Sequence, residues 1–242
     1  MSLLVLMYHR ACVGRHGNAP EMLDAHFAHV AHHHPQVLPG EALAAGATNV
    51  CLSFDDAYFD FYATVFPLLQ RHGLRALLAV PPAYIRETAE ASTAERLAIE
   101  SDEAFARPER GGFCTWSELA EMVASGHVAI AAHGHTHRRL DAAEADLSIE
   151  IDRVQTVLGT RLGCPVDSFV FPFGRYSPRS LGHARQRYRH VFRIGGALNR
   201  SWSGRVLYRV DADRMATPQS LFAPARILHY RVRFLWNRLR LR

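Results

Sequence analysis

Short apolar runs, separated by stretches with helical periodicity, dominate the sequence. Seven runs have the length of a strand and lack the apolar–polar alternation of a half-exposed sheet. They are Leu3–His9, Asn49–Phe54, Leu74–Val80, Val128–Ala132, Ser168–Phe171, His190–Ile194 and Leu207–Val210. Continuous apolar runs of this kind indicate strands that are buried on both faces, as in a parallel sheet or barrel.

Helical patterns lie between the predicted strands. Asp60–His72 and Leu147–Leu162 keep their apolar residues on one face, Thr115–Glu118 has the pattern of a capping box, and Pro178 begins a further helix. Alternation of strands and helices over most of the chain predicts an α/β barrel. Because there is no internal repeat and no linker, we expect a single domain over residues 1–242.

Two segments depart from this alternation. Residues 87–110 are charged and only weakly periodic, and we interpret them as an insertion or lid. Residues 228–242 form a basic tail in which arginines alternate with apolar residues. The tail is either a solvated terminal helix or strand, or an amphipathic segment whose residues 230–242 contact an anionic membrane surface.

Composition and charge narrow the class of protein. The chain has 242 residues, 48% hydrophobic and 21% charged, with a net charge of +5, which is ordinary for a globular protein. No apolar run reaches the roughly 18 residues of a membrane span. The N-terminus lacks the basic region and cleavage site of a signal peptide, so we expect a cytoplasmic protein, peripheral at the inner membrane face if the tail binds lipid. Basic residues outside the tail are dispersed, so we expect no nucleic-acid partner.

Cysteine usage fits the same compartment. Cys12, Cys51, Cys114 and Cys164 are scattered and form no CxxC pair. We therefore expect buried, reduced thiols.

The first candidate for chemistry is the pair Asp55–Asp56 at the end of a predicted strand. Active sites of parallel barrels lie at this edge. Adjacent carboxylates point in different directions, so one can bind a metal while the other acts as a base. An Asp-Asp pair can equally be an ordinary turn or helix cap.

The second candidate is His133–His137, which reads His-Gly-His-Thr-His after an apolar strand. Neutral imidazole suits a borderline metal such as zinc, and residues four apart face the same way on one turn of helix-like backbone. His135 would point elsewhere, as a supporting residue as readily as a ligand. The alternative is a polar loop in a chain with 15 histidines.

The third candidate is Phe171–Tyr176, in which a strand is broken by Pro172 and Gly174. Backbone N–H groups left free at such a strand end can form an oxyanion hole. His9 ends the first predicted strand on the same edge. The histidine run at 32–34 is expected on a helix face.

Taken together, these motifs resemble the polysaccharide deacetylase family, also called the NodB-homology domain or carbohydrate esterase family four. The resemblance is to the type with an N-terminal Tyr-His pair. The matching segments, in chain order, are Met7–Arg10, Ser53–Asp56, Trp116, Gly126–Val128, His133–His137, Leu140 and Phe171–Tyr176. Each is weak alone, but the ordered set is specific and spans residues 3–200.

The resemblance implies a distorted (β/α)7-type barrel. It implies a divalent metal ion held by Asp56, His133 and His137, for which we expect zinc, with cobalt, nickel or manganese as alternatives. Asp55 then corresponds to the general base. His9 corresponds to the general acid, supplied from the first strand.

The third motif carries the remaining roles that the resemblance implies. The backbone N–H of Phe173 corresponds to an oxyanion donor, and we expect Pro172, Arg175 and Tyr176 to bind substrate. Many members carry an arginine shortly before this proline that braces the base. That arginine is missing here, or its role passes to Arg175 or another residue.

The implied function is removal of an N-acyl group, acetyl or alternatively formyl, from an amino sugar. The expected partner is a carbohydrate: a polysaccharide or a lipid- or nucleotide-linked sugar of surface polysaccharide or O-antigen biosynthesis. The alternatives are a non-catalytic carbohydrate-binding barrel on the same scaffold and a different metal-dependent hydrolase such as a phosphoesterase. The oligomeric state is not predicted.

Overall fold

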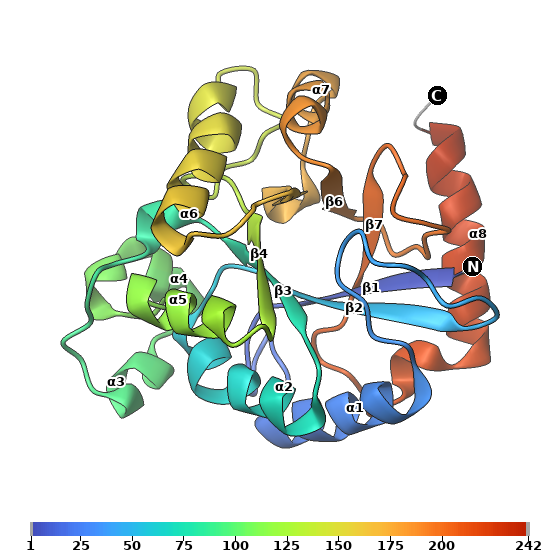
Figure 1. Cartoon of the computed structure of the whole chain (residues 1–242), viewed down its shortest axis with the longest axis horizontal. Coiled ribbons are helices and arrows are strands. Elements are labelled where there is room, and N and C mark those ends of the chain that lie inside the picture. Colours follow the sequence, from blue (N-terminus) through green and yellow to red (C-terminus); the bar gives the residue numbers. More distant parts are fainter. Residues whose placement is uncertain (1, 241–242) are drawn as a thin grey trace.

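Seven parallel strands close into a barrel in chain order (Figure 1). The computed structural model describes residues 2–240, and in it β7 pairs with β1 to complete the ring. The strands are β1 Ser2–Tyr8, β2 Thr48–Phe54, β3 Ala76–Val80, β4 Val128–Ala132, β5 Ser168–Val170, β6 His190–Ile194 and β7 Leu207–Asp211. All seven predicted strands are present, which confirms the predicted α/β barrel in a single domain.

Helices surround the strands. They are α1 Pro20–His33, α2 Phe66–His72, α3 Thr93–Ala98, α4 Ser101–Ala106, α5 Trp116–Ala124, α6 Val154–Leu162, α7 Pro178–Arg187 and α8 Pro224–Arg240. The helix predicted over Asp60–His72 begins with a π-helical stretch, Phe61–Val65, before α2. The predicted capping box is confirmed, because the Thr115 side chain accepts from the Glu118 N–H and Glu118 bonds back to Thr115.

Strand residues alternate between two apolar clusters. Val5, Cys51, Leu77 and Phe192 belong to a small cluster built almost entirely from the strands, which fills the barrel interior. Their neighbours along each strand belong to the larger cluster that also contains the helices. Because side chains alternate along a strand, every second residue just beyond a strand end still faces the barrel axis and can contribute to a site there.

The barrel is uneven around its circumference. β1 and β2 pair along all seven residues of each strand, whereas β4 and β5 share only the pair Ala132 and Phe169. The short pairing between β4 and β5 makes the closed barrel irregular, in agreement with the distorted (β/α)7-type barrel that the resemblance implies.

The segment 87–110, predicted as an insertion or lid, contains α3 and α4. Arg96 within it is buried and makes a bidentate ion pair with Glu118 of α5, with its nearest contact at 2.6 Å. Arg10, which pairs with Asp60 at 2.6 Å, also donates to the Ile99 carbonyl. These buried arginines fix the segment against the barrel.

Helix α8 contains most of the predicted basic tail, while residues 241–242 of that tail lie outside the described residues. Over residues 2–240, no helix combines the length and apolar character needed to cross a membrane. All four cysteines are free thiols; Cys51 and Cys114 are buried, and Cys12 and Cys164 are partly buried.

We predict that Phe192→Ala lowers the free energy of unfolding by about 3–5 kcal/mol, because it leaves a cavity in the barrel interior. Urea denaturation measures the change. Val13→Ala is the control, since Val13 is 89% exposed and its truncation should stay within about 0.5 kcal/mol. A similar small change for Phe192→Ala would contradict the assignment of this residue to the core.

Candidate metal and catalytic site

The alternation of strand residues collects polar groups at the carboxyl edge of the barrel. Leu3, Val5, Cys51, Ala131 and Leu207 face the interior. Residues an even number of positions further along the same strands face the same side of the barrel wall. They are His9, Asp55, His133, Arg209 and Asp213. Strands β1, β2, β4 and β7 therefore each contribute to one site.

Three residues of the site have unusual backbone conformations. Asp56, His137 and Phe173 have φ of 74°, 52° and 57°, in the left-handed region that non-glycine residues rarely adopt. Backbone strain of this kind persists at sites where side-chain placement matters. At Asp56 it breaks the alternation, so that this side chain and that of Asp55 both reach the site.

Asp56, His133 and His137 form the one cluster within residues 2–240 that could hold a metal ion. The Nε2 atoms of His133 and His137 lie 3.4 and 3.2 Å from Asp56 Oδ1, and the three ligand atoms are within 4.8 Å of one another. Asp56 Oδ1 is buried, yet no described residue donates a hydrogen bond to it. A buried acceptor without a donor fits a cation-binding site.

Each of the two histidines has a ring nitrogen that can bind a cation. His133 Nδ1 lies 2.9 Å from the Val170 carbonyl, which can only accept, so Nδ1 carries the proton and Nε2 is free. Burial lowers the pKa of His137 to about 4, so this ring is neutral at pH 7. Burial alone would raise the pKa of Asp56, but the two imidazoles hold it below its usual range.

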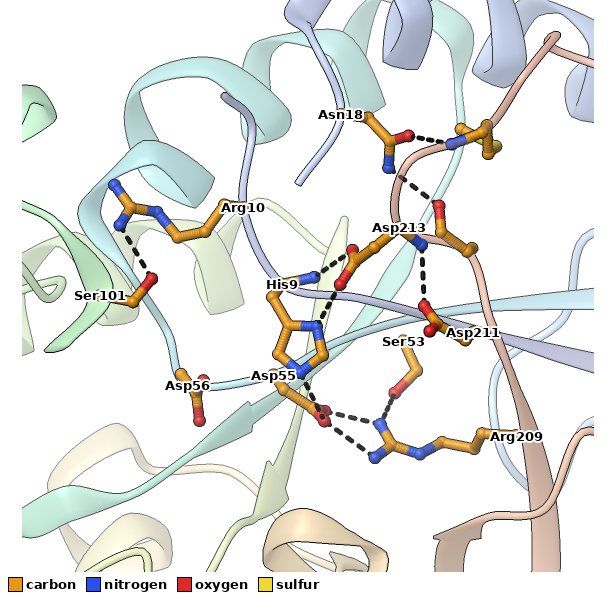
Figure 2. A network of polar contacts seen from close by, with 12 residues as sticks. His9, Arg10, Asn18, Ser53, Asp55, Asp56, Ser101, Arg209, Asp211 and Asp213 are labelled. Atoms are coloured by element: carbon orange, nitrogen blue, oxygen red, sulfur yellow. Dashed lines mark hydrogen bonds and ion pairs between the residues drawn. The ribbon is translucent and has the colours of Figure 1, made fainter. Parts of the chain in front are cut away.

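The Asp55 carboxylate pairs with an arginine (Figure 2) and lies 3.9 Å from His133 Nε2. The guanidinium of Arg209, 1% exposed, donates to both carboxylate oxygens of Asp55 at 2.6 and 2.8 Å. It also donates to Ser53 Oγ at 3.1 Å. Burial would raise the pKa of Asp55, but the Arg209 charge keeps it below its usual value, so Asp55 is an ionised carboxylate.

His9 is oriented by a second carboxylate (Figure 2). Its Nδ1 lies 2.7 Å from Asp213 Oδ2, and its backbone N–H donates to Asp213 Oδ1. The other ring nitrogen lies 3.9 Å from Asp55 Oδ2. Burial disfavours the charged ring, but the Asp213 hydrogen bond and the charges of Asp55 and Asp56 raise the pKa of His9 to about 9.

Arg209 and Asp213 were not predicted from the sequence. Arg175, named as one candidate to brace the base, is exposed, and Arg209 of β7 makes that contact instead. The sequence does indicate a role for Arg209. An arginine inside the apolar run Leu207–Val210 is expected to be buried, and a buried arginine needs a charged or polar partner. Asp213 follows the same strand, at the edge where His9 also lies.

The turn after β5 lies beside the ligand cluster. The Phe173 ring is 57% exposed and its centroid is 4.7 Å from that of His137. Pro172 is buried, Arg175 is exposed, and Tyr176 contacts Arg193 at 3.2 Å. The oxyanion role of the Phe173 amide stays a prediction.

A cavity of about 650 Å³ opens over the site. Its described lining comprises Met7, His9, His16, Asp55, Asp56, Tyr58, Tyr84, Ser101, Asp102, Phe105, His133, His137, Phe173, Ile194, Asp211 and Asp213. The predicted metal ligands, base and acid are therefore together in one cavity. Pro172, Arg175 and Tyr176 are not among these residues, so their substrate-binding role also stays a prediction. His135, left open as a ligand, belongs neither to this lining nor to the described metal cluster.

Helix α4 of the 87–110 segment forms one wall of the cavity. Ser101, Asp102 and Phe105 line it, and the Phe105 ring stacks on His137 with centroids 4.7 Å apart. Phe105 and Phe173 thus both contact the His137 ring. The segment covers part of the site, and its movement as a lid stays a prediction.

Solved structures with this fold include several deacetylases. IcaB from Ammonifex degensii is 20% identical, with a TM-score of 0.73 over 93% of this chain and 97% of that chain. The Streptococcus pyogenes deacetylase PplD, in complex with acetate, is 19% identical, with a TM-score of 0.72 over 92% and 97%. A de-N-acetylase from Aggregatibacter actinomycetemcomitans is 19% identical, with a TM-score of 0.71 over 92% and 99%. At these identities the likeness shows the fold alone.

Comparison with family models identifies the family. The model described as polysaccharide deacetylase matches residues 44–189, more than half of the chain. A search of curated proteins finds no match. The matched range includes Asp55, Asp56, His133, His137 and Phe173. The chain therefore belongs to the polysaccharide deacetylase family and is a hydrolase that acts on amide bonds.

Proposed function

We propose that this protein is a metal-dependent N-deacetylase that removes the acetyl group from an N-acetylated amino sugar. The observation that carries the proposal is that two adjacent carboxylates have different partners. Asp56 faces His133 and His137, whereas Asp55 is held by Arg209 outside the ligand cluster. One carboxylate can thus bind a cation while the other stays available to accept a proton.

Asp56, His133 and His137 would hold the ion, as the unpartnered Oδ1 of Asp56 and the free Nε2 of His133 suggest. Two imidazoles and one carboxylate favour zinc, with cobalt, nickel or manganese as alternatives. A divalent cation in this position supplies a Lewis acid for the acyl carbonyl and lowers the pKa of a water molecule.

Asp55 acts as the general base in this proposal. Its carboxylate is ionised, buried and fixed by two hydrogen bonds from Arg209. It accepts the proton of the water that attacks the amide carbonyl. Positioned proton transfer contributes typically about 10²–10⁴-fold to rate.

His9 acts as the general acid. Its proton on Nδ1 is held by Asp213, so Nε2 is the atom that donates to the leaving amine. The raised pKa keeps the ring charged at neutral pH. The Phe173 amide is proposed to donate to the carbonyl oxygen as negative charge develops there.

The cavity supports a sugar as substrate. Its walls combine the aromatic rings of Tyr58, Tyr84, Phe105 and Phe173 with carboxylates, and about 650 Å³ is ample for one sugar unit. Acetyl is proposed over formyl because the solved structures with this fold include a de-N-acetylase and a deacetylase bound to acetate. We propose a surface polysaccharide or O-antigen precursor as the source, processed on the cytoplasmic side.

The alternatives predict different observations. A phosphoesterase with two metals needs a second ligand set, and residues 2–240 contain only one. A non-catalytic barrel needs no ordered base, yet Asp55 is braced and faces His9. Two metals per chain would favour the first alternative, and absence of acetate release with intact sugar binding would favour the second.

The central test measures acetate released from oligomers of N-acetylglucosamine, with and without chelator. We expect release that stops with chelator and returns with zinc. Asp55→Asn should keep about one metal per chain but lose at least about 10²-fold in kcat. His133→Ala should lose the metal, measured by elemental analysis, because it removes a ligand. Near-normal turnover in the Asp55 variant, or retained metal in the His133 variant, would refute these roles.

The pH profile tests His9. Its protonated form is the active one, so activity should be present below the pKa of His9 and fall as pH rises through it. That limb lies at or below pH 9, because a bound cation opposes the charges that raise the pKa to about 9.

Asp213→Asn removes the carboxylate that bonds to His9 Nδ1, so the alkaline limb of kcat should move to lower pH. Asp141→Asn is the control, since Asp141 pairs with Arg139 outside the cavity lining. An unmoved alkaline limb in a folded, metal-loaded Asp213 variant would rule out His9 as the acid.

The variant Arg209→Gln tests whether Arg209 keeps the proposed base, Asp55, ionised. Without the guanidinium, burial should raise the pKa of Asp55, so the acid limb of kcat/KM should move to higher pH. Arg209→Lys keeps the charge but not the two parallel hydrogen bonds, and its shift should be smaller. Metal content identifies folded protein in both variants. An acid limb that is the same as in the wild type would show that Arg209 does not set the protonation of Asp55.

A further inference from the structure

Helix α8 is anchored to the barrel along one face. Tyr230 is buried, and its carbonyl accepts from the Leu198 N–H at 3.2 Å. Asn237 donates to the Gly195 carbonyl at 3.0 Å. The helix is therefore fixed along much of its length, with the opposite face turned to the outside of the molecule (Figure 1).

The opposite face carries an apolar row, which we name the outer stripe: Leu228, Val232, Leu235 and Leu239. Their spacings of four, three and four residues place them on one side of the helix. They are 62%, 57%, 55% and 65% exposed. Four large aliphatic residues in a continuous exposed row are unusual for a surface that faces only water.

Arginines lie on both sides of the outer stripe. At about 100° per residue, Arg231 and Arg238 fall beside the stripe on one side, whereas Arg233 lies farther round on the other side; all three are exposed. The sequence of α8, Pro224–Arg240, contains no acidic residue. An apolar row with arginines on either side suits a bilayer surface, where the apolar row would meet the acyl chains and the arginines would meet the phosphates above them.

A basic cavity adjoins the same helix. It has a volume of about 430 Å³, and its lining includes Arg200, Arg205 and Arg238 and no acidic side chain. The guanidinium carbons of Arg200 and Arg238 lie 5.5 and 5.8 Å from the centre of the Phe234 ring. The positive charge of α8 therefore continues onto the neighbouring loop, which extends the surface that would attract anions.

We propose that α8 is a docking surface for a bilayer of anionic phospholipid, with the outer stripe among the acyl chains and the arginines at the phosphates. The helix lies in the interface and does not span it, because its inner face is occupied by the barrel. A second copy of the chain is a poorer occupant. Pairing of two α8 helices would bring arginine rows together with no acidic residue on either helix to neutralise them.

Vesicle flotation of the full chain tests this surface. Phosphatidylcholine vesicles, with and without phosphatidylglycerol, are the probes. We expect binding to the anionic vesicles at least about tenfold tighter than to the neutral ones, and weaker as salt rises.

The outer stripe is tested by a fourfold variant, Leu228→Ser, Val232→Ser, Leu235→Ser and Leu239→Ser. It should bind anionic vesicles at least about tenfold more weakly while keeping the wild-type circular dichroism spectrum, because these side chains are exposed. Val13→Ser, which removes an exposed apolar residue elsewhere, is the matched control and should bind like the wild type.

The flanking charge is tested by Arg231→Gln with Arg238→Gln. Each arginine near an anionic surface contributes roughly fivefold to binding, so the pair should lose at least about tenfold. Arg185→Gln with Arg189→Gln removes the same charge from exposed positions elsewhere and should have little effect.

Three results would overturn the proposal. They are no wild-type binding to anionic vesicles, equal binding by the α8 variants and their controls, or a dimer in solution that the fourfold variant dissociates. Acetate release from a water-soluble oligosaccharide is measured on the same variants and should be unchanged. Failure of membrane binding is thereby separated from failure of the proposed catalytic function.

Discussion

The bidentate contact between Arg209 and Asp55 gives the site its asymmetry. Two neighbouring carboxylates, both buried, would repel each other and compete for one cation. With Arg209 on both oxygens of Asp55, the negative charge of that residue is compensated locally and its orientation is fixed. Asp56 is left to face the two histidines. The same pair of aspartates can therefore supply a ligand and a base.

This contact depends in turn on closure of the barrel. Arg209 lies on β7 and Asp55 follows β2, and β1 pairs with both strands. Arg209 and Ser53 both face the interior, and β1 pairs Val5 with Arg209 and Met7 with Ser53. The Arg209 side chain therefore points onward to Ser53 and Asp55 and donates to both. His9, directly after β1, lies between Asp55 and Asp213. The proposed base, the proposed acid and their two partners thus come from three adjacent strands, while β4 and the loop after it supply the two imidazoles.

Much of this arrangement was predictable from the sequence. The buried strands appear as continuous apolar runs, and the motifs at their ends have residue types that suit metal binding and proton transfer. Arg209 and Asp213 were harder to assign, because their partners are about 154 and 204 residues away and are identified only when β7 meets β1. The role of α4 was also hidden, since Phe105 reaches His137 through packing that no local pattern encodes.

The decisive measurement is diffraction from crystals grown with zinc, with data collected at the zinc absorption edge. We expect one anomalous peak per chain, about 2.0–2.2 Å from ligand atoms of Asp56, His133 and His137, with Asp55 still paired to Arg209 and outside the coordination sphere. A peak coordinated by Asp55, or an ion bound away from the two histidines, would contradict it.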